Sequence, residues 1–176
     1  IKDEGFSIKM QGDKIHISAG GYLGTMWGIY TFSEKILGIN PCYLFNDYKV
    51  AKKAKLEVED INITDAPKSF GFRGVFINDE DLLAGWKDGG GIRYMNWHSD
   101  NTTVPENVIN LVVETMLRLK LNLIIPATYL NIDNPSEKLI ADCAVRRGMY
   151  ISQHHIEPVG VSAYTFKNYC DKFGKG

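Results

Sequence analysis

Two short stretches near the N-terminus, residues 6–10 and 15–18, alternate apolar and polar side chains. A period of two is typical of a β-strand that buries one face, and Gly12-Asp13 between the stretches is typical of a turn. The pattern therefore predicts a β-hairpin. His16 lies at an outward position of the second strand, so we interpret it as a solvent-facing residue and not as a ligand.

After the hairpin the period becomes that of a helix. Between Gly21 and Gly38, apolar side chains recur at spacings of three and four residues, and Gly38 is a typical helix end. A short strand at residues 43–45 and an interrupted, edge-like strand at residues 56–63 are predicted to follow. Together these elements predict a small α/β domain built on a mainly antiparallel sheet.

The pattern changes at Pro67, and we predict two domains, residues 1–66 and residues 67–176. In the second domain, buried strands alternate with helical patterns, which implies crossover connections and a parallel sheet. The three predicted strands are residues 71–77, 121–126 and 149–152.

Local signals place the helices of the second domain. Thr103 is expected to cap one helix, Asn134 to start another, and residues 164–173 to form a last one. The Gly-rich stretch 86–103 has no periodicity and is predicted to be a long loop, a kind of segment that is often functional.

Two of the three predicted strands end in polar, titratable side chains. These residues are Asn78, Asp79, Glu80 and Asp81 after the first strand, and His154, His155 and Glu157 after the third. An acidic run can be a solvated turn, but clustered carboxylates repel one another unless a bound cation or a proton neutralises them. Functional residues of parallel sheets gather beyond the carboxyl ends of the strands. The convergence of both groups there favours a site.

Composition excludes some partners. The chain of 176 residues is 44% hydrophobic and 23% charged, with a net charge of −1. A net charge this close to zero gives no sign of a basic surface that would bind nucleic acid or an anionic membrane. No apolar stretch approaches the roughly 20 residues of a membrane helix. The three cysteines are widely spaced and are expected to be buried free thiols.

The motifs predict neither a cofactor nor a metal. No phosphate-binding or dinucleotide-binding glycine motif occurs. Adjacent histidines in a loop are a weak metal signal because successive side chains diverge. Carboxylates, imidazoles, amides and aromatic rings at strand ends best fit a carbohydrate site, where polar groups bind hydroxyls and rings stack on sugars.

Three segments resemble successive parts of glycoside hydrolase family 115. They are residues 71–81 (GFRGVFINDED), 116–127 (MLRLKLNLIIPA) and 151–158 (ISQHHIEP). Residues 24–38 are similar to the small α/β domain that precedes the catalytic barrel in that family and in other glycosidases. Members of the family are α-glucuronidases that remove (4-O-methyl)glucuronic acid from xylan.

The resemblance implies an inverting enzyme whose second domain is the start of a (β/α)₈ (TIM) barrel. It implies that Asp79 and Glu80 are catalytic. It also implies substrate-binding roles for Asn78, His154, His155 and Glu157. The substrate would be a poly- or oligosaccharide, and the resemblance suggests a secreted or periplasmic protein.

We expect the barrel to be incomplete. The 109 residues after Pro67 are too few, because a barrel needs roughly 200 or more. The chain is therefore expected to be an N-terminal piece that does not hydrolyse glycosides alone. An open parallel sheet leaves an unpaired edge, which also allows a homo-oligomer. Two alternatives stay open: a non-catalytic carbohydrate-binding or assembly protein on the same fold, and a metal-dependent hydrolase using His154, His155 and Glu157.

Overall fold

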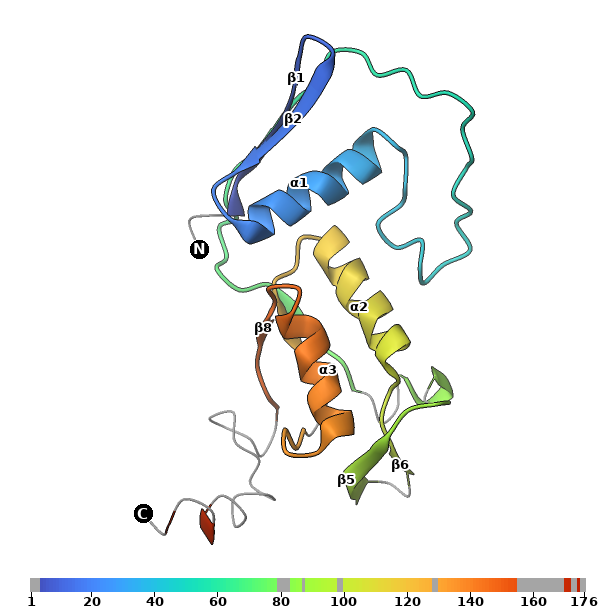
Figure 1. Ribbon diagram of the computed structural model, residues 1–176, viewed down its shortest axis with the longest axis vertical. Helices are drawn as coiled ribbons and strands as arrows, with labels where there is room; N and C mark the ends of the chain where they lie inside the picture. Colours follow the sequence, from blue (N-terminus) through green and yellow to red (C-terminus); the bar gives the residue numbers. More distant parts are fainter. Residues whose placement is uncertain are drawn as a thin grey trace. The chain divides into compact units, whose positions relative to one another are not determined.

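A computed structural model describes residues 4–78, 83–86, 88–97, 100–127, 130–154, 170–171 and 174 of the chain (Figure 1). The chain divides into two compact units. One unit comprises residues 1–73 and 114–122, and the other comprises residues 74–113 and 123–176. The predicted domain boundary at residues 66–67 stays a prediction.

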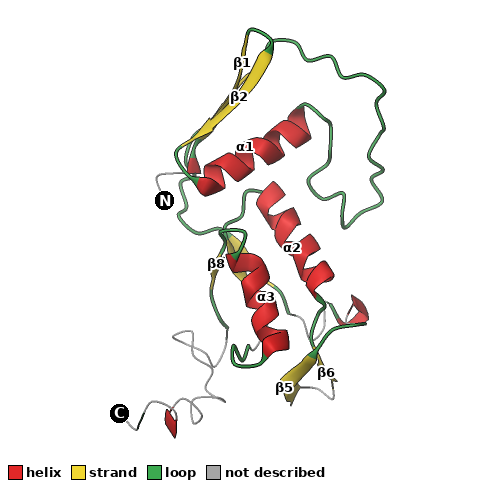
Figure 2. Cartoon of the chain, viewed as in Figure 1, coloured by secondary structure: helices red, strands yellow, loops and turns green. Residues whose placement is uncertain are grey.

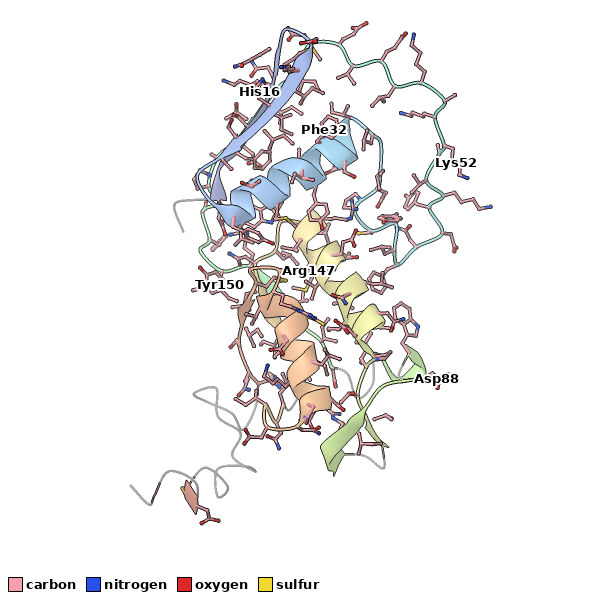
Figure 3. All side chains as sticks on the ribbon, in the orientation of Figure 1. His16, Phe32, Lys52, Asp88, Arg147 and Tyr150 are labelled. Atoms are coloured by element: carbon pink, nitrogen blue, oxygen red, sulfur yellow. The ribbon has the colours of Figure 1, made fainter. Side chains whose placement is uncertain are left out.

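The first unit contains an antiparallel sheet of three strands. The strands are β1 (Phe6–Gln11), β2 (Lys14–Ala19) and β3 (Asn62–Asp65), in the order β2-β1-β3. The predicted hairpin is confirmed: β1 pairs with β2, and Gly12 in the turn has a φ of 63°. His16 is exposed on the hairpin, as predicted (Figure 3).

Helix α1 (Tyr22–Lys35) packs on this sheet, as the helical periodicity predicts. The core between them consists of Phe6, Ile8, Trp27 and Ile61. Gly28 allows the close approach, because a Cβ on it would lie 2.6 Å from Cγ2 of Ile17. Gly38 has a φ of 74°, in the region that favours glycine after a helix.

Two predictions for this unit are wrong. Residues 43–45 form turns and not a strand: Asn40 accepts hydrogen bonds from the amides of Cys42 (2.8 Å, at Oδ1) and Tyr43 (3.1 Å, at the carbonyl). The strand predicted at 56–63 begins only at Asn62. The residues before Ile61 follow an irregular path, visible as a long loop in Figure 2.

The second unit contains a parallel sheet of three strands. They are β4 (Gly74–Phe76), β7 (Leu123–Ile125) and β8 (Tyr150–Ile151), in the order β4-β7-β8. Helix α2 (Glu106–Arg118) lies between β4 and β7 in the chain, and α3 (Pro135–Val145) lies between β7 and β8. The described part of the chain is thus a mixed α/β fold with an antiparallel and a parallel sheet, as predicted in outline.

The stretch predicted to be a structureless loop is partly regular. It contains the 3₁₀ helix η2 (Ala84–Trp86) and a hairpin of β5 (Ile92–Trp97) and β6 (Asp100–Thr102). A register shift interrupts this hairpin, so its sequence lacks the alternation that identifies a strand pair. Thr103 does not cap α2 as predicted. Its hydroxyl accepts from the amide of Gly91 (3.0 Å) and donates to the Gly91 carbonyl (3.2 Å).

The last predicted helix, residues 164–173, lies almost entirely outside the described residues. Within the described part of the chain, every helix is too short or too polar to cross a membrane.

A buried amide joins the segments that lead into β4 and β7. Asn122 is 0% exposed; its Oδ1 accepts from the amide of Arg73 (2.8 Å), and its own amide donates to the Arg73 carbonyl (2.9 Å). Its Nδ2 donates to Glu4 Oε1 (2.7 Å) and to the Gly71 carbonyl (2.8 Å). Arg73 Nη2 lies 2.9 Å from Glu4 Oε2. The two groups form an ion pair, but their geometry is not that of a hydrogen bond. Asn122 therefore ties Glu4 and residues 71–73 of the first unit together.

The next residue of each segment begins the parallel ladder. Gly74 lies opposite Leu123, and a Cβ on Gly74 would lie only 2.2 Å from the Leu123 carbonyl oxygen. Because that atom belongs to the backbone of a paired strand, it cannot move aside without breaking the pairing. Only glycine fits here.

We predict that Gly74→Ala lowers the free energy of unfolding by about 1–3 kcal/mol, the usual cost of forcing extra atoms into a packed position. Urea denaturation measures this change. Gly71→Ala is the matched control, since a Cβ there has no atom within 4 Å. Equal stability of the two variants would show that β4 and β7 do not approach as closely as described.

Candidate functional site

The carboxyl ends of β4, β7 and β8 share one edge of the parallel sheet. Each flanking strand adds one hydrogen bond to β7 beyond its last paired residue: Ile77 N donates to the Ile125 carbonyl (2.9 Å), and Ser152 N donates to the Ile124 carbonyl (3.1 Å). Asn78 and Gln153 come directly after these bonds. The structure therefore brings the chain after β4 and the chain after β8 to the same edge.

An aromatic contact lies at this edge. The rings of Phe76 and His154 are stacked, with centroids 4.2 Å apart and planes inclined by 19°. Phe76 is the last residue of β4, and His154 follows β8 by three residues. Both side chains are half-buried. The stack links the two strand ends that sequence reasoning singled out.

The predicted site residues fall into two groups. Asn78 and His154 are described and half-buried at the shared edge. The others lie outside the described residues; they are Asp79, Glu80, His155 and Glu157. Their catalytic or substrate-binding roles therefore stay predictions. Phe76 was not predicted to belong to the site, although its place just before the polar run was a signal for it.

The connection from β7 to α3 is held by a buried carboxylate. Glu137 is 0% exposed; it accepts from the amide of Asn131 (2.5 Å) and from Nδ2 of Asn134 (2.9 Å). Asn134 caps α3 as predicted, accepting from the amide of Ser136 (3.3 Å). Sequence reasoning missed Glu137, although Asn at the cap and Glu three residues later is the capping-box pattern.

A buried thiol in this unit is structural. Cys143 is 1% exposed, and burial raises the pKa of its thiol above the ordinary value even though Arg146 Nη2 lies 3.4 Å from Sγ. A thiol with a raised pKa is a poor nucleophile. All three cysteines are free, as predicted, but Cys42 and Cys170 are half-buried, so the expectation of buried thiols holds for Cys143 alone. The described residues contain no group of three or more side chains that could hold a metal ion.

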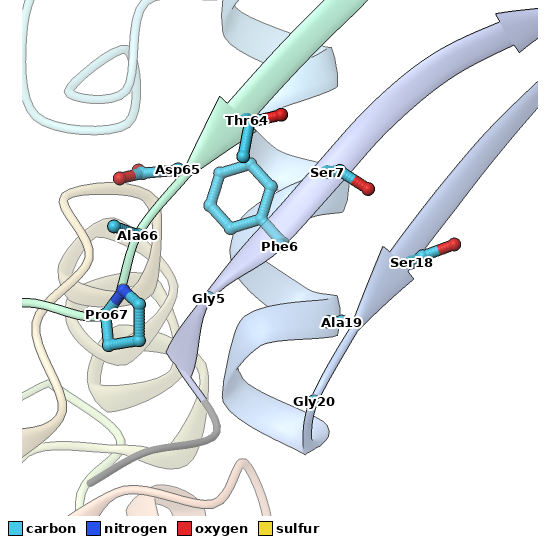
Figure 4. A pocket seen from close by; sticks show the side chains of 10 residues that line it. All are labelled: Gly5, Phe6, Ser7, Ser18, Ala19, Gly20, Thr64, Asp65, Ala66 and Pro67. Atoms are coloured by element: carbon cyan, nitrogen blue, oxygen red, sulfur yellow. The ribbon is translucent and has the colours of Figure 1, made fainter.

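The first unit has an open hollow of its own at the end of its sheet (Figure 4). Asp65 is its charged lining residue. Burial alone would raise the pKa of Asp65, but hydrogen bonds from Lys120 (2.7 Å) and Lys68 outweigh it and hold the pKa below the ordinary value. Because two lysines already satisfy this carboxylate, the hollow offers little to a ligand, and it contains no predicted site residue.

Comparisons with known proteins identify related chains. The model of glycosyl hydrolase family 115 matches residues 65–175, more than half of the chain. No curated protein matches. One similar solved structure is a family GH115 4-O-methyl-α-glucuronidase with specificity for decorated arabinogalactans. It has a TM-score of 0.67 and 24% sequence identity, and the match covers 88% of this chain and 20% of that one. This chain therefore spans a fifth of that protein, and the likeness shows the fold.

We predict that Glu137→Gln lowers the free energy of unfolding by about 1–3 kcal/mol, because the amide can no longer accept from both the buried amide of Asn131 and Nδ2 of Asn134. Urea denaturation and amide hydrogen exchange at Asn131 measure this effect. Asp142→Asn on the same helix is the control, since that carboxylate is 42% exposed and pairs with Lys138; it should change stability by about 0.5 kcal/mol or less. Unchanged exchange at Asn131 in Glu137→Gln would contradict the role given to Glu137.

Proposed function

Because the chain belongs to glycosyl hydrolase family 115, we propose that it is the N-terminal part of a glycoside hydrolase. In this proposal the enzyme is an inverting α-glucuronidase that removes (4-O-methyl)glucuronic acid from a xylan-type polysaccharide. The similar solved structure is a 4-O-methyl-α-glucuronidase specific for decorated arabinogalactans, so an arabinogalactan is a second candidate polymer. The uronic acid is common to both.

We propose that residues 67–176 form the first three β/α units of a (β/α)₈ barrel. The described strands are parallel, lie in the order of the chain and are joined through α2 and α3. This arrangement is that of consecutive units of such a barrel. The match to only 20% of the similar chain supports a longer protein that supplies the remaining units.

The observation that carries the proposal is the meeting of two strand ends at one edge, within the segment that the family model matches. In barrel enzymes, the active site lies at this carboxyl edge. Asn78 offers an amide and His154 an imidazole there, and both groups bind sugar hydroxyls or a uronate carboxylate.

Catalysis is assigned to the carboxylates Asp79 and Glu80, which follow Asn78 directly in the chain. An inverting glycosidase needs one carboxylic acid to protonate the leaving oxygen and one carboxylate to activate water. The two groups are about 6.5–9.5 Å apart. In this proposal the residues that follow β4 supply one carboxyl group of the acid–base pair, and a later strand of the barrel supplies the other. His155 and Glu157 would complete the binding groups after β8.

We predict that the 176-residue chain binds glucuronate more tightly than glucose and does not hydrolyse an aryl α-glucuronide. Asn78→Ala and His154→Gln should each weaken glucuronate binding about three- to tenfold, the effect of losing one hydrogen bond. Titration followed by NMR measures binding, and release of the aryl group measures hydrolysis.

His16→Gln is the matched control, because His16 is exposed on the hairpin of the first unit. It should leave binding unchanged. Equal affinity for glucose and glucuronate, or full glucuronate affinity in both Asn78→Ala and His154→Gln, would contradict the proposed site. Turnover by the 176-residue chain would contradict the need for carboxylates from later strands.

A further inference from the structure

The stack of Phe76 on His154 joins the ends of two strands that do not pair with each other. Their strands, β4 and β8, are not neighbours, because β7 lies between them. Adjacent strands are about 4.8 Å apart, so β4 and β8 are separated by roughly 10 Å. His154, however, lies three residues beyond the end of β8, and its ring centroid is 4.2 Å from that of Phe76. The chain after β8 therefore brings His154 close to the end of β4.

The strand register shows which side chains share a face of the sheet with Phe76. Phe76 pairs with Ile125, and Leu123 pairs with Tyr150, so the next step of the ladder sets Ser152 in the same row as Phe76 and Ile125. Paired residues of a parallel sheet project from the same face. The side chains of Phe76, Ile125 and Ser152 therefore share one face of the sheet.

The stack restricts how the imidazole can point. With its plane inclined by only 19° to the phenyl ring, both imidazole nitrogens lie in a layer nearly parallel to that ring. Their hydrogen-bonding directions lie in the imidazole plane, so the phenyl face fixes the plane in which His154 donates or accepts. An aromatic pair of this kind contributes about 0.5–1.5 kcal/mol beyond its buried area.

We propose that Phe76 is a positioning residue for His154, holding the imidazole in the orientation that binds a saccharide oxygen at the carboxyl edge. This assignment rests on the proposed function of that edge. Phe76 acts through His154 by fixing the orientation of the imidazole. An unstacked histidine side chain would lose rotational freedom when it binds a sugar, and the stack reduces this entropic cost.

A purely structural role for Phe76 makes a different prediction. If the ring only fills space, an apolar side chain of similar size should preserve both folding and sugar binding. If the ring orients His154, the replacement should keep the fold and lose affinity. An aromatic replacement should retain the affinity.

The experiment compares Phe76→Leu, Phe76→Met and Phe76→Tyr in the 176-residue chain, with Phe72→Leu as the control. Phe72 is 62% exposed in the first unit, so its ring should not affect the site. NMR of histidine-labelled protein reports the imidazole protons of His154, which are assigned by comparison with His154→Gln. Ring-current shifts reveal the stack, and exposed His16 gives the unstacked reference. Each variant is then titrated with glucuronate.

We expect the His154 signals to be displaced from those of His16 in the wild-type chain, Phe72→Leu and Phe76→Tyr. In Phe76→Leu and Phe76→Met the displacement should vanish and glucuronate affinity should fall about two- to tenfold. Phe76→Met provides a second apolar side chain if Phe76→Leu does not fold. Undisplaced His154 signals in the wild-type chain, or full glucuronate affinity in an apolar variant that has lost the stack, would overturn the assignment.

Absence of glucuronate binding by the wild-type chain would overturn the proposed function and the positioning role together. Wild-type binding that the apolar variants retain would overturn the positioning role alone.

Discussion

One buried amide, that of Asn122, holds together segments of the first unit that lie far apart in the sequence. Asn122 uses its side-chain oxygen and nitrogen on three partners from the N-terminal part of the chain, and its backbone amide donates to Arg73. A buried amide with all these groups paired tolerates no shift of register, because a shift would leave several of them unpaired. In the second unit, Gly74 lies opposite Leu123, and the ladder runs from there to Phe76 opposite Ile125, with one further hydrogen bond from the amide of Ile77.

Elements with local signals were predictable from the sequence. The hairpin, α1 and the Asn134 cap of α3 depend on neighbours a few residues away, and each was found. The β5–β6 hairpin was not predicted because its register shift interrupts the alternation of apolar and polar residues. The strand predicted at residues 43–45 is wrong because turn hydrogen bonds outweigh the strand propensity of these residues. Asn122 was read as part of an apolar strand. Its partner Glu4 lies 118 residues away, and no local pattern reports such a bond.

The candidate site, too, was predictable only where the signal is local in the sequence. The polar runs after β4 and β8 were visible in the sequence, and parallel topology brings their strands to one edge. The Phe76–His154 stack was not predictable, since it joins two residues far apart in the sequence, one of which lies beyond the end of its strand. Elsewhere in the described residues, buried polar groups such as Glu137 and Cys143 serve the fold. The chemistry assigned to the chain is therefore concentrated at the carboxyl edge of the parallel sheet.

We propose that this edge receives a uronic acid, and a crystal structure of the protein with glucuronic acid bound tests this directly. We expect the sugar beyond the carboxyl ends of β4 and β8, within hydrogen-bond distance of Asn78 and His154. A sugar bound instead in the hollow beside Asp65, or Asp79 and His155 on opposite sides of the sheet, would contradict it.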